Sequence, residues 1–318
     1  MIEEANYAQE MREIVLPALS ACREDAFTEG FDGKPLHYAH FTAQEEKGVV
    51  VICHGFTESC EKFHELTYAF LQKGYSVYII EHRGHGRSYR KLANQTLTHI
   101  DRFENYVRDF TCFMDQVVRT KEKGKPLFLF AHSMGGAIGT LYLEQAPDVF
   151  RKAVLSSPMV APSGGGFPIF LARAIVWLFK LFGQAEKRAF ISEEYPGHEE
   201  FENSACSSRA RFDYYQAMKT TTKELQNYSP TYSWVFESLR VKNLIMKGDP
   251  SKIKIPVKLF VGEYDTVVER PPQEELARKL PDCSLEEIRG AKHELYLAPN
   301  EILAGYLDSL FRFLDQEP

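Results

Sequence analysis

Short apolar runs rich in β-branched residues recur along the chain and alternate with stretches of helical periodicity. Five runs are apolar on both faces: residues 49–53, 76–80, 126–131, 152–157 and 256–261. Strands of this kind belong in a parallel sheet that is covered on both sides. Between them, FENYVRDFTCFMDQVV (103–118) repeats apolar residues at three- and four-residue spacing, which predicts one face of a helix. The alternation predicts a doubly wound α/β fold with a mostly parallel central sheet and helices on both faces.

The alternation is interrupted once, after the run at 152–157. Residues 158–243 contain an apolar segment (GGGFPIFLARAIVWLFKLFG), an acidic stretch (SEEYPGHEEFE) and an aromatic stretch (RFDYYQAM). Because the strand pattern resumes at Pro256, we interpret the segment as an insertion and not as an independent domain. We therefore expect a core made of residues 1–158 and 244–318, with a helical cap at 159–243. Ligand sites in such sheets lie beyond the carboxyl ends of the strands, where this cap would cover them.

Composition limits the partners and the compartment. The net charge is −6, which gives no basic face for displacing counterions from a duplex, so no nucleic-acid partner is expected. The six cysteines are scattered, without a CxxC pair, which indicates reduced thiols. The start, MIEEANYAQEMREIVLPAL, has acidic residues where a secretory signal has basic and apolar ones. A cytoplasmic location is expected.

The segment FLFAHSMGGAIG (128–139) places a serine between an apolar run and a helix rich in small residues. The chain must turn sharply at Ser133, and the residues two before and two after it must be nearly free of side chain for the backbone to pass. Ala131 and Gly135 occupy these places, and the alanine departs from the usual G-x-S-x-G pattern by one methyl group. A serine that only capped a helix would not require a glycine on its far side. Ser133 is the predicted nucleophile.

A serine hydroxyl becomes a nucleophile when a base takes its proton, and the base needs a carboxylate to fix its tautomer. The order expected in this kind of fold is serine, acid, histidine. Asp265 comes just after the strand predicted at 256–261, and His293 follows the short run SLEEI (284–288) in a loop before the last helix. The predicted triad is Ser133, Asp265 and His293.

Acyl transfer also needs donors that point at the developing oxyanion. One is expected from the backbone N–H of Met134, directly after the nucleophile. The loop in VICHGFTES (51–59), after the first central strand, should supply the other, and we assign it to the N–H of Phe56.

Four motifs of the chain form a recognisable set. CHGFTESCEKFHELTYAFLQKGYSVYIIEHRGHGRS, AHSMGGAIG, LFVGEYDTVVE and AKHELYLAP together resemble the α/β-hydrolase family of bacterial lysophospholipases and monoacylglycerol lipases, from about residue 31 to the C-terminus. The resemblance implies an α/β-hydrolase fold and hydrolysis of a lysophospholipid or monoacylglycerol through an acyl-serine, with no metal ion or organic cofactor. Some members place the acid four residues later, which makes Glu269 the alternative to Asp265.

Three rival functions stay open at this stage. A short-chain carboxylesterase would use the same residues. A proline-type aminopeptidase would need an ammonium site, which the cap acids Glu193, Glu194, Glu199, Glu200 and Glu202 could form. A silent binding protein of this fold would keep the pocket and lose the triad, whereas all three triad positions are filled. Transfer of the acyl group to an alcohol would also proceed through the acyl-serine.

The apolar segment PIFLARAIVWLFKLF (168–182) predicts a cap helix about 22 Å long. A bilayer span needs roughly 30 Å, so the helix is not expected to cross a membrane. Arg173 and Lys180 share one edge and are expected to stay in water, while Phe170 and Trp177 are expected to contact the acyl chain of the substrate. The same face would allow peripheral contact with a membrane.

Overall fold

The computed structural model describes residues 2–164 and 169–316, and within them eight strands form one sheet. The order across the sheet is β1-β2-β4-β3-β6-β7-β9-β10. The strands from β4 to β10 run parallel, and β2 is antiparallel to both β1 and β4. Their bounds are β1 Arg23–Glu29, β2 Pro35–Phe41, β3 Gly48–Cys53, β4 Tyr75–Ile80, β6 Leu127–His132, β7 Lys152–Ser156, β9 Val257–Gly262 and β10 Cys283–Ile288.

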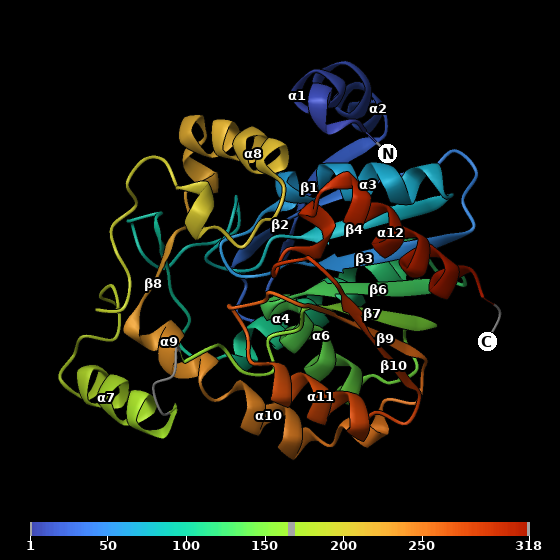
Figure 1. Ribbon diagram of the computed structural model, residues 1–318. Coiled ribbons are helices and arrows are strands. Elements are labelled where there is room, and N and C mark those ends of the chain that lie inside the picture. The colour runs from blue at the N-terminus through green and yellow to red at the C-terminus, as the bar shows by residue number, and fades with distance from the viewer. Residues whose placement is uncertain (1, 165–168, 317–318) are drawn as a thin grey trace.

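Helices cover both faces of the sheet (Figure 1). The N-terminal helices, α3 and α12 lie on one face, and α4, α6, α10 and α11 on the other. The bounds are α1 Tyr7–Glu10, α2 Leu16–Ser20, α3 His64–Gln72, α4 Glu104–Phe113, α5 Arg119–Lys121, α6 Met134–Gln145, α7 Ile169–Leu181, α8 Arg209–Thr221, α9 Tyr232–Ser238, α10 Val241–Gly248, α11 Arg270–Lys279 and α12 Asn300–Asp315.

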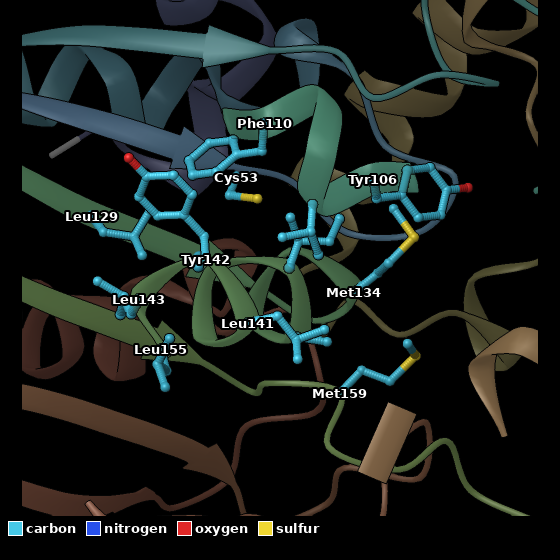
Figure 2. Close-up of a cluster of buried hydrophobic side chains, with 14 of the residues drawn as sticks. Cys53, Tyr106, Phe110, Leu129, Met134, Leu141, Tyr142, Leu143, Leu155 and Met159 are labelled. Atoms are coloured by element: carbon cyan, nitrogen blue, oxygen red, sulfur yellow. The ribbon is translucent and has the colours of Figure 1, made fainter. Parts of the chain in front are cut away.

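The central strands contribute to two cores, as their sequence predicts. In β3, Val49 and Val51 point to the side of α4 and α6, whereas Val50 and Ile52 point to the side of α3 and α12. Strand side chains alternate between the two faces, so a strand with helices on both sides must be apolar at every position. In Figure 2, Leu143 of α6 lies with Leu129 and Leu155, which come from β6 and β7. This packing fixes the helix that follows Ser133.

The structure adds elements that the sequence analysis did not identify. Strands β1 and β2 form an antiparallel hairpin at one edge of the sheet, and a two-residue pair, β5 (Leu97–Thr98) with β8 (Ser229–Pro230), joins the core to the inserted segment. The helix predicted over 103–118 is present, but its last five residues, Met114–Val118, form a π-helical stretch. The apolar residues that define its predicted face are all buried: Phe103, Tyr106, Val107, Phe110, Phe113, Met114, Val117 and Val118.

The inserted segment contains α7, α8 and α9, which lie to one side of the sheet in Figure 1. Helix α9 connects this segment to the core because the ring of Trp234 packs 4.1 Å from the ring of Phe56, three residues after β3 ends. Helix α7 in turn packs against α9, where the rings of Phe179 and Tyr232 stack 4.4 Å apart. The predicted helix at 168–182 therefore exists as α7, and its first predicted residue, Pro168, lies outside the described residues.

Candidate active site

Ser133 lies at a sharp turn between β6 and α6. Its backbone has φ 52° and ψ −119°, in the left-handed region that side-chain-bearing residues rarely adopt. A Cβ on Gly135 would lie 2.0 Å from the carbonyl oxygen of Cys53, so only glycine fits there. Ala131 is fully buried, and its methyl group fits the other restricted position. Backbone strain of this kind is typical of a nucleophile elbow.

Asp265 and His293 meet beyond the carboxyl end of the sheet. Asp265 follows β9, and its Oδ2 lies 2.7 Å from Nδ1 of His293. Its Oδ1 accepts hydrogen bonds from the N–H groups of Val267 (2.8 Å) and Val268 (3.2 Å). Burial would raise the pKa of Asp265, but His293 and these two donors lower it below its usual value. The carboxylate is therefore ionised and fixes the proton of His293 on Nδ1, which leaves Nε2 as the basic nitrogen.

The second nitrogen of His293 is directed away from Asp265. Nε2 is buried and has no hydrogen-bond partner among the described residues. The imidazole packs 4.9 Å from the ring of His132, the residue directly before Ser133. Both Ser133 and His293 are more than nine-tenths buried. The structure thus brings all three predicted triad residues to one place.

The loop after β3 approaches the nucleophile from the other side. A Cβ on Gly55 would lie 2.9 Å from Cβ of Ser133, so the backbone of residues 55 and 56 runs beside the serine. Met134 is the first residue of α6, and the first N–H groups of a helix have no acceptor within the helix. The N–H groups of Phe56 and Met134 are thus both in segments adjacent to Ser133.

Glu269, the alternative acid, has other partners. Its N–H donates to the carbonyl of Ala161 (3.0 Å), and its Oε1 accepts from the N–H of Gly164 (3.2 Å). It stands directly before α11 and holds the segment after β7. The geometry pairs His293 with Asp265.

A buried carboxylate that the sequence analysis did not identify connects the two loops of the site. Glu58 accepts hydrogen bonds from the N–H of Gly55 (2.5 Å) and from the hydroxyl of Tyr296 (2.5 Å), and it lies 3.4 Å from Nζ of Lys62. Burial opposes its ionisation, but His132, Lys62 and Tyr296 lower the pKa of Glu58 to about 2. Its position four residues after His54 gives no sign of this role, because Tyr296 is distant in sequence.

His132 beside the nucleophile is a packing residue. Its Nδ1 lies 3.0 Å from the carbonyl oxygen of Ser156, and burial lowers its pKa to about 4. It is neutral at pH 7, so it adds no charge beside His293.

One buried group within residues 2–164 and 169–316 combines residue types that bind metals: His37, Cys60 and Glu81. Nδ1 of His37 lies 2.9 Å from Oε2 of Glu81, while the Glu81 oxygens accept the N–H groups of Cys60 (3.2 Å) and Arg87 (2.7 Å). These bonds satisfy the carboxylate and fix the turn after β4.

Helix α7 exposes most of its apolar side chains. Phe170 is 73% exposed and Trp177 50%, and the patch continues over Leu171, Leu178, Leu181, Phe182, Phe190 and Ile191. The expectation for the basic edge is half correct: Arg173 is exposed, but Lys180 lies over the ring of Phe236 (4.4 Å) and near Glu237 (3.6 Å). Where the structure is described, no helix is both long and apolar enough to span a bilayer.

The acids of the cap do not converge on the site. Glu193, Glu194, Glu200 and Glu202 are exposed, and the partly buried Glu199 forms an ion pair with Lys219. Four of the five therefore lie on a solvated surface.

The chain is similar in sequence and in fold to several known proteins. The serine aminopeptidase S33 family (Hydrolase_4) matches residues 44–300. Lysophospholipase L2 of Escherichia coli is 34% identical over 248 residues, which cover 78% of this chain and 72% of that protein. A probable lysophospholipase L2 of Haemophilus influenzae is 29% identical over 288 residues, 88% of each chain. The structure of a monoglyceride lipase from Saccharomyces cerevisiae superposes with a TM-score of 0.72 at 20% identity over 92% of this chain and 95% of that one.

These matches confirm two predictions made from sequence, the α/β-hydrolase fold and the resemblance to lysophospholipases and monoacylglycerol lipases. The family match spans the turn at Ser133, both loops beside it and the acid–histidine pair. The chain therefore belongs to the serine aminopeptidase S33 (Hydrolase_4) family and is a hydrolase of the α/β-hydrolase fold.

Proposed function

We propose that the protein hydrolyses the carboxylic ester of monoacyl lipids, a lysophospholipid or a monoacylglycerol, through an acyl-Ser133 intermediate. The observation that carries the proposal is the Asp265–His293 pair, whose imidazole keeps Nε2 unpaired among the described residues and packs against His132, the residue directly before the strained Ser133. The names of the relatives supply the substrate class.

In this mechanism Nε2 of His293 takes the proton of Ser133 as its Oγ attacks the ester carbonyl. The N–H groups of Phe56 and Met134 stabilise the oxyanion of the tetrahedral intermediate. His293 then gives its proton to the leaving alcohol, which leaves an acyl-serine. A water molecule, activated by the same nitrogen, releases the fatty acid and restores the enzyme. Asp265 keeps the imidazole in the required tautomer and stabilises it while charged.

The exposed apolar residues of helix α7 favour a substrate with a long acyl chain. Phe170 and Trp177 belong to a patch of exposed large apolar side chains, and patches of this extent mark surfaces for lipids or partners. We propose that residues 159–243 act as a cap, that Phe170 and Trp177 meet the acyl chain, and that the patch makes peripheral contact with a membrane. The scattered cap acids give no reason to favour an aminopeptidase.

The cap proposal predicts a chain-length effect. Trp177→Ser and Phe170→Ser should lower kcat/KM for a long-chain monoacylglycerol about tenfold or more, since each removes apolar contact worth about 1.5–3 kcal/mol when buried. The acyl group of p-nitrophenyl acetate is too short to reach α7, so its kcat/KM should not change. The measurement is kcat/KM for both esters.

Phe27→Ser is the matched control, because Phe27 is similarly exposed (58%) but belongs to β1. It should leave both esters unaffected. Equal losses on the two esters in folded cap variants would contradict the proposal and make the protein a short-chain esterase.

A further inference from the structure

The loop that carries His293 is bonded to the cap as well as to the core. On one side of the histidine, the N–H of Lys292 donates to Oγ of Ser207 (3.1 Å), and on the other the N–H of Glu294 donates to the carbonyl of Ala205 (3.1 Å). The carbonyl of Leu297 accepts the N–H of Ser208 (3.3 Å). The segment 204–208 therefore holds the backbone on both sides of His293.

The segment 204–208 leads directly into α8, and Ser208 caps that helix. Its Oγ accepts the N–H of Arg211 (3.4 Å) and donates to the carboxylate of Glu4 near the N-terminus. The same carboxylate accepts the N–H of Asn300, the first residue of α12 (2.9 Å). Glu4 thus joins the start of the cap helix to the start of a core helix.

Arg211 is the buried centre of this arrangement. Its side chain is fully buried and donates from Nε and Nη2 to the two oxygens of Glu65 on α3, at 2.7 Å each. Nη2 also donates to Oδ1 of Asn300 (2.7 Å), and Nη1 lies 3.5 Å from Glu4. The guanidinium lies over the ring of Tyr7, whose hydroxyl donates to Glu65 (3.0 Å).

The N-terminal segment closes this site from outside. Its helices α1 and α2 stand beside α8 and α3 (Figure 1), so Tyr7 and Glu4 cover the guanidinium. The family model matches from residue 44, so the segment 2–20 lies outside the matched residues. A guanidinium that donates two hydrogen bonds to one carboxylate fixes both its position and its angle, which a lysine ammonium does not do.

We propose that Arg211 is a positioning residue for His293, and that the N-terminal segment, through Glu4 and Tyr7, completes its binding site. Arg211 holds the start of α8 against α3 and α12, and α8 holds segment 204–208 under the histidine loop. The inference rests on the proposed role of His293 as the base.

The test measures three properties of Arg211→Met, Arg211→Lys, Glu4→Ala and Tyr7→Phe in the full chain. They are the rate at which a fluorophosphonate labels Ser133, kcat and KM for a short ester, and amide hydrogen exchange in the peptide that covers 292–298. Glu4→Ala should slow labelling and lower kcat about tenfold, with KM unchanged, and should speed exchange at Glu294. Arg211→Met should change the labelling rate, kcat and exchange by larger factors. The values for Arg211→Lys should lie between those of Arg211→Met and the wild type.

Two matched controls separate this role from general stability. Arg209→Met removes an arginine from the same helix, where Arg209 forms an exposed pair with Asp213 (2.8 Å), and Glu13→Ala removes an exposed acid from the N-terminal segment. In both controls, the labelling rate of Ser133 and the amide hydrogen exchange of residues 292–298 should equal those of the wild type. If Arg211→Met fails to fold, the labelling rates and hydrogen exchange of Glu4→Ala and Tyr7→Phe test the proposal.

Wild-type labelling rates and loop exchange in the folded variants, with only a lower melting temperature, would overturn the inference. Absence of Ser133 labelling in the wild type would instead overturn the proposed function, and hydrogen exchange would still decide whether Arg211 fixes the loop.

Discussion

Replacing Ser133 with alanine is expected to lower kcat by at least about a thousandfold on every ester the protein hydrolyses, because binding and oxyanion donors alone retain little catalysis. The same substitution should abolish labelling by a fluorophosphonate. Both effects follow from the position of Ser133 at the strained turn, directly after His132, whose ring packs against His293. Ester hydrolysis and stoichiometric labelling are the measurements.

Ser157→Ala is a suitable control for this variant. Ser157 is also buried and has a positive φ of 46°, but it follows β7 and not the elbow strand. Its replacement should leave labelling intact. Persistent stoichiometric labelling of the Ser133 variant would mean that another residue is the nucleophile.

Asp265→Asn is expected to lower kcat about 10⁴-fold, because an amide in place of the carboxylate favours the wrong tautomer of His293. Glu269→Gln should leave kcat nearly unchanged, since Glu269 bonds to the backbone after β7 and not to His293. Both variants replace a carboxylate by its amide and keep its shape. Steady-state kinetics on one ester compare them directly.

The reverse result, with Glu269→Gln the inactive variant, would assign the acid to the later position in the loop. Loss of activity in both variants would indicate that the segment held by Glu269 also shapes the site.

The parallel part of the fold could be predicted from sequence because burial on both faces leaves a clear pattern. Strands β3, β4, β6, β7 and β9 have no polar face, so each appears as a continuous apolar run. Strand β1 (REDAFTE) is mostly solvent-exposed and highly charged, and its pairing with β2 depends on contacts across the hairpin. Such an edge strand has no comparable signal in its own residues.

The candidate triad could also be anticipated, because each of its residues follows a recognisable strand or turn. The supporting residues could not. Glu58 and Arg211 look like ordinary charged residues of amphipathic segments, and their partners Tyr296 and Glu65 are distant in the chain. Likewise, the apolar content of α7 predicted a helix, but only the fold shows that Lys180 packs against α9 while the aromatic residues remain exposed.

The most direct measurement of the central claim is a comparison of kcat/KM for four substrates: a long-chain monoacylglycerol, a lysophosphatidylcholine of equal chain length, p-nitrophenyl acetate and a prolyl p-nitroanilide. We expect at least one long-chain monoacyl lipid to exceed p-nitrophenyl acetate by about tenfold or more, as apolar contact along the acyl chain implies. The prolyl amide should not be cleaved. Cleavage of the prolyl amide with no hydrolysis of either lipid would contradict the account.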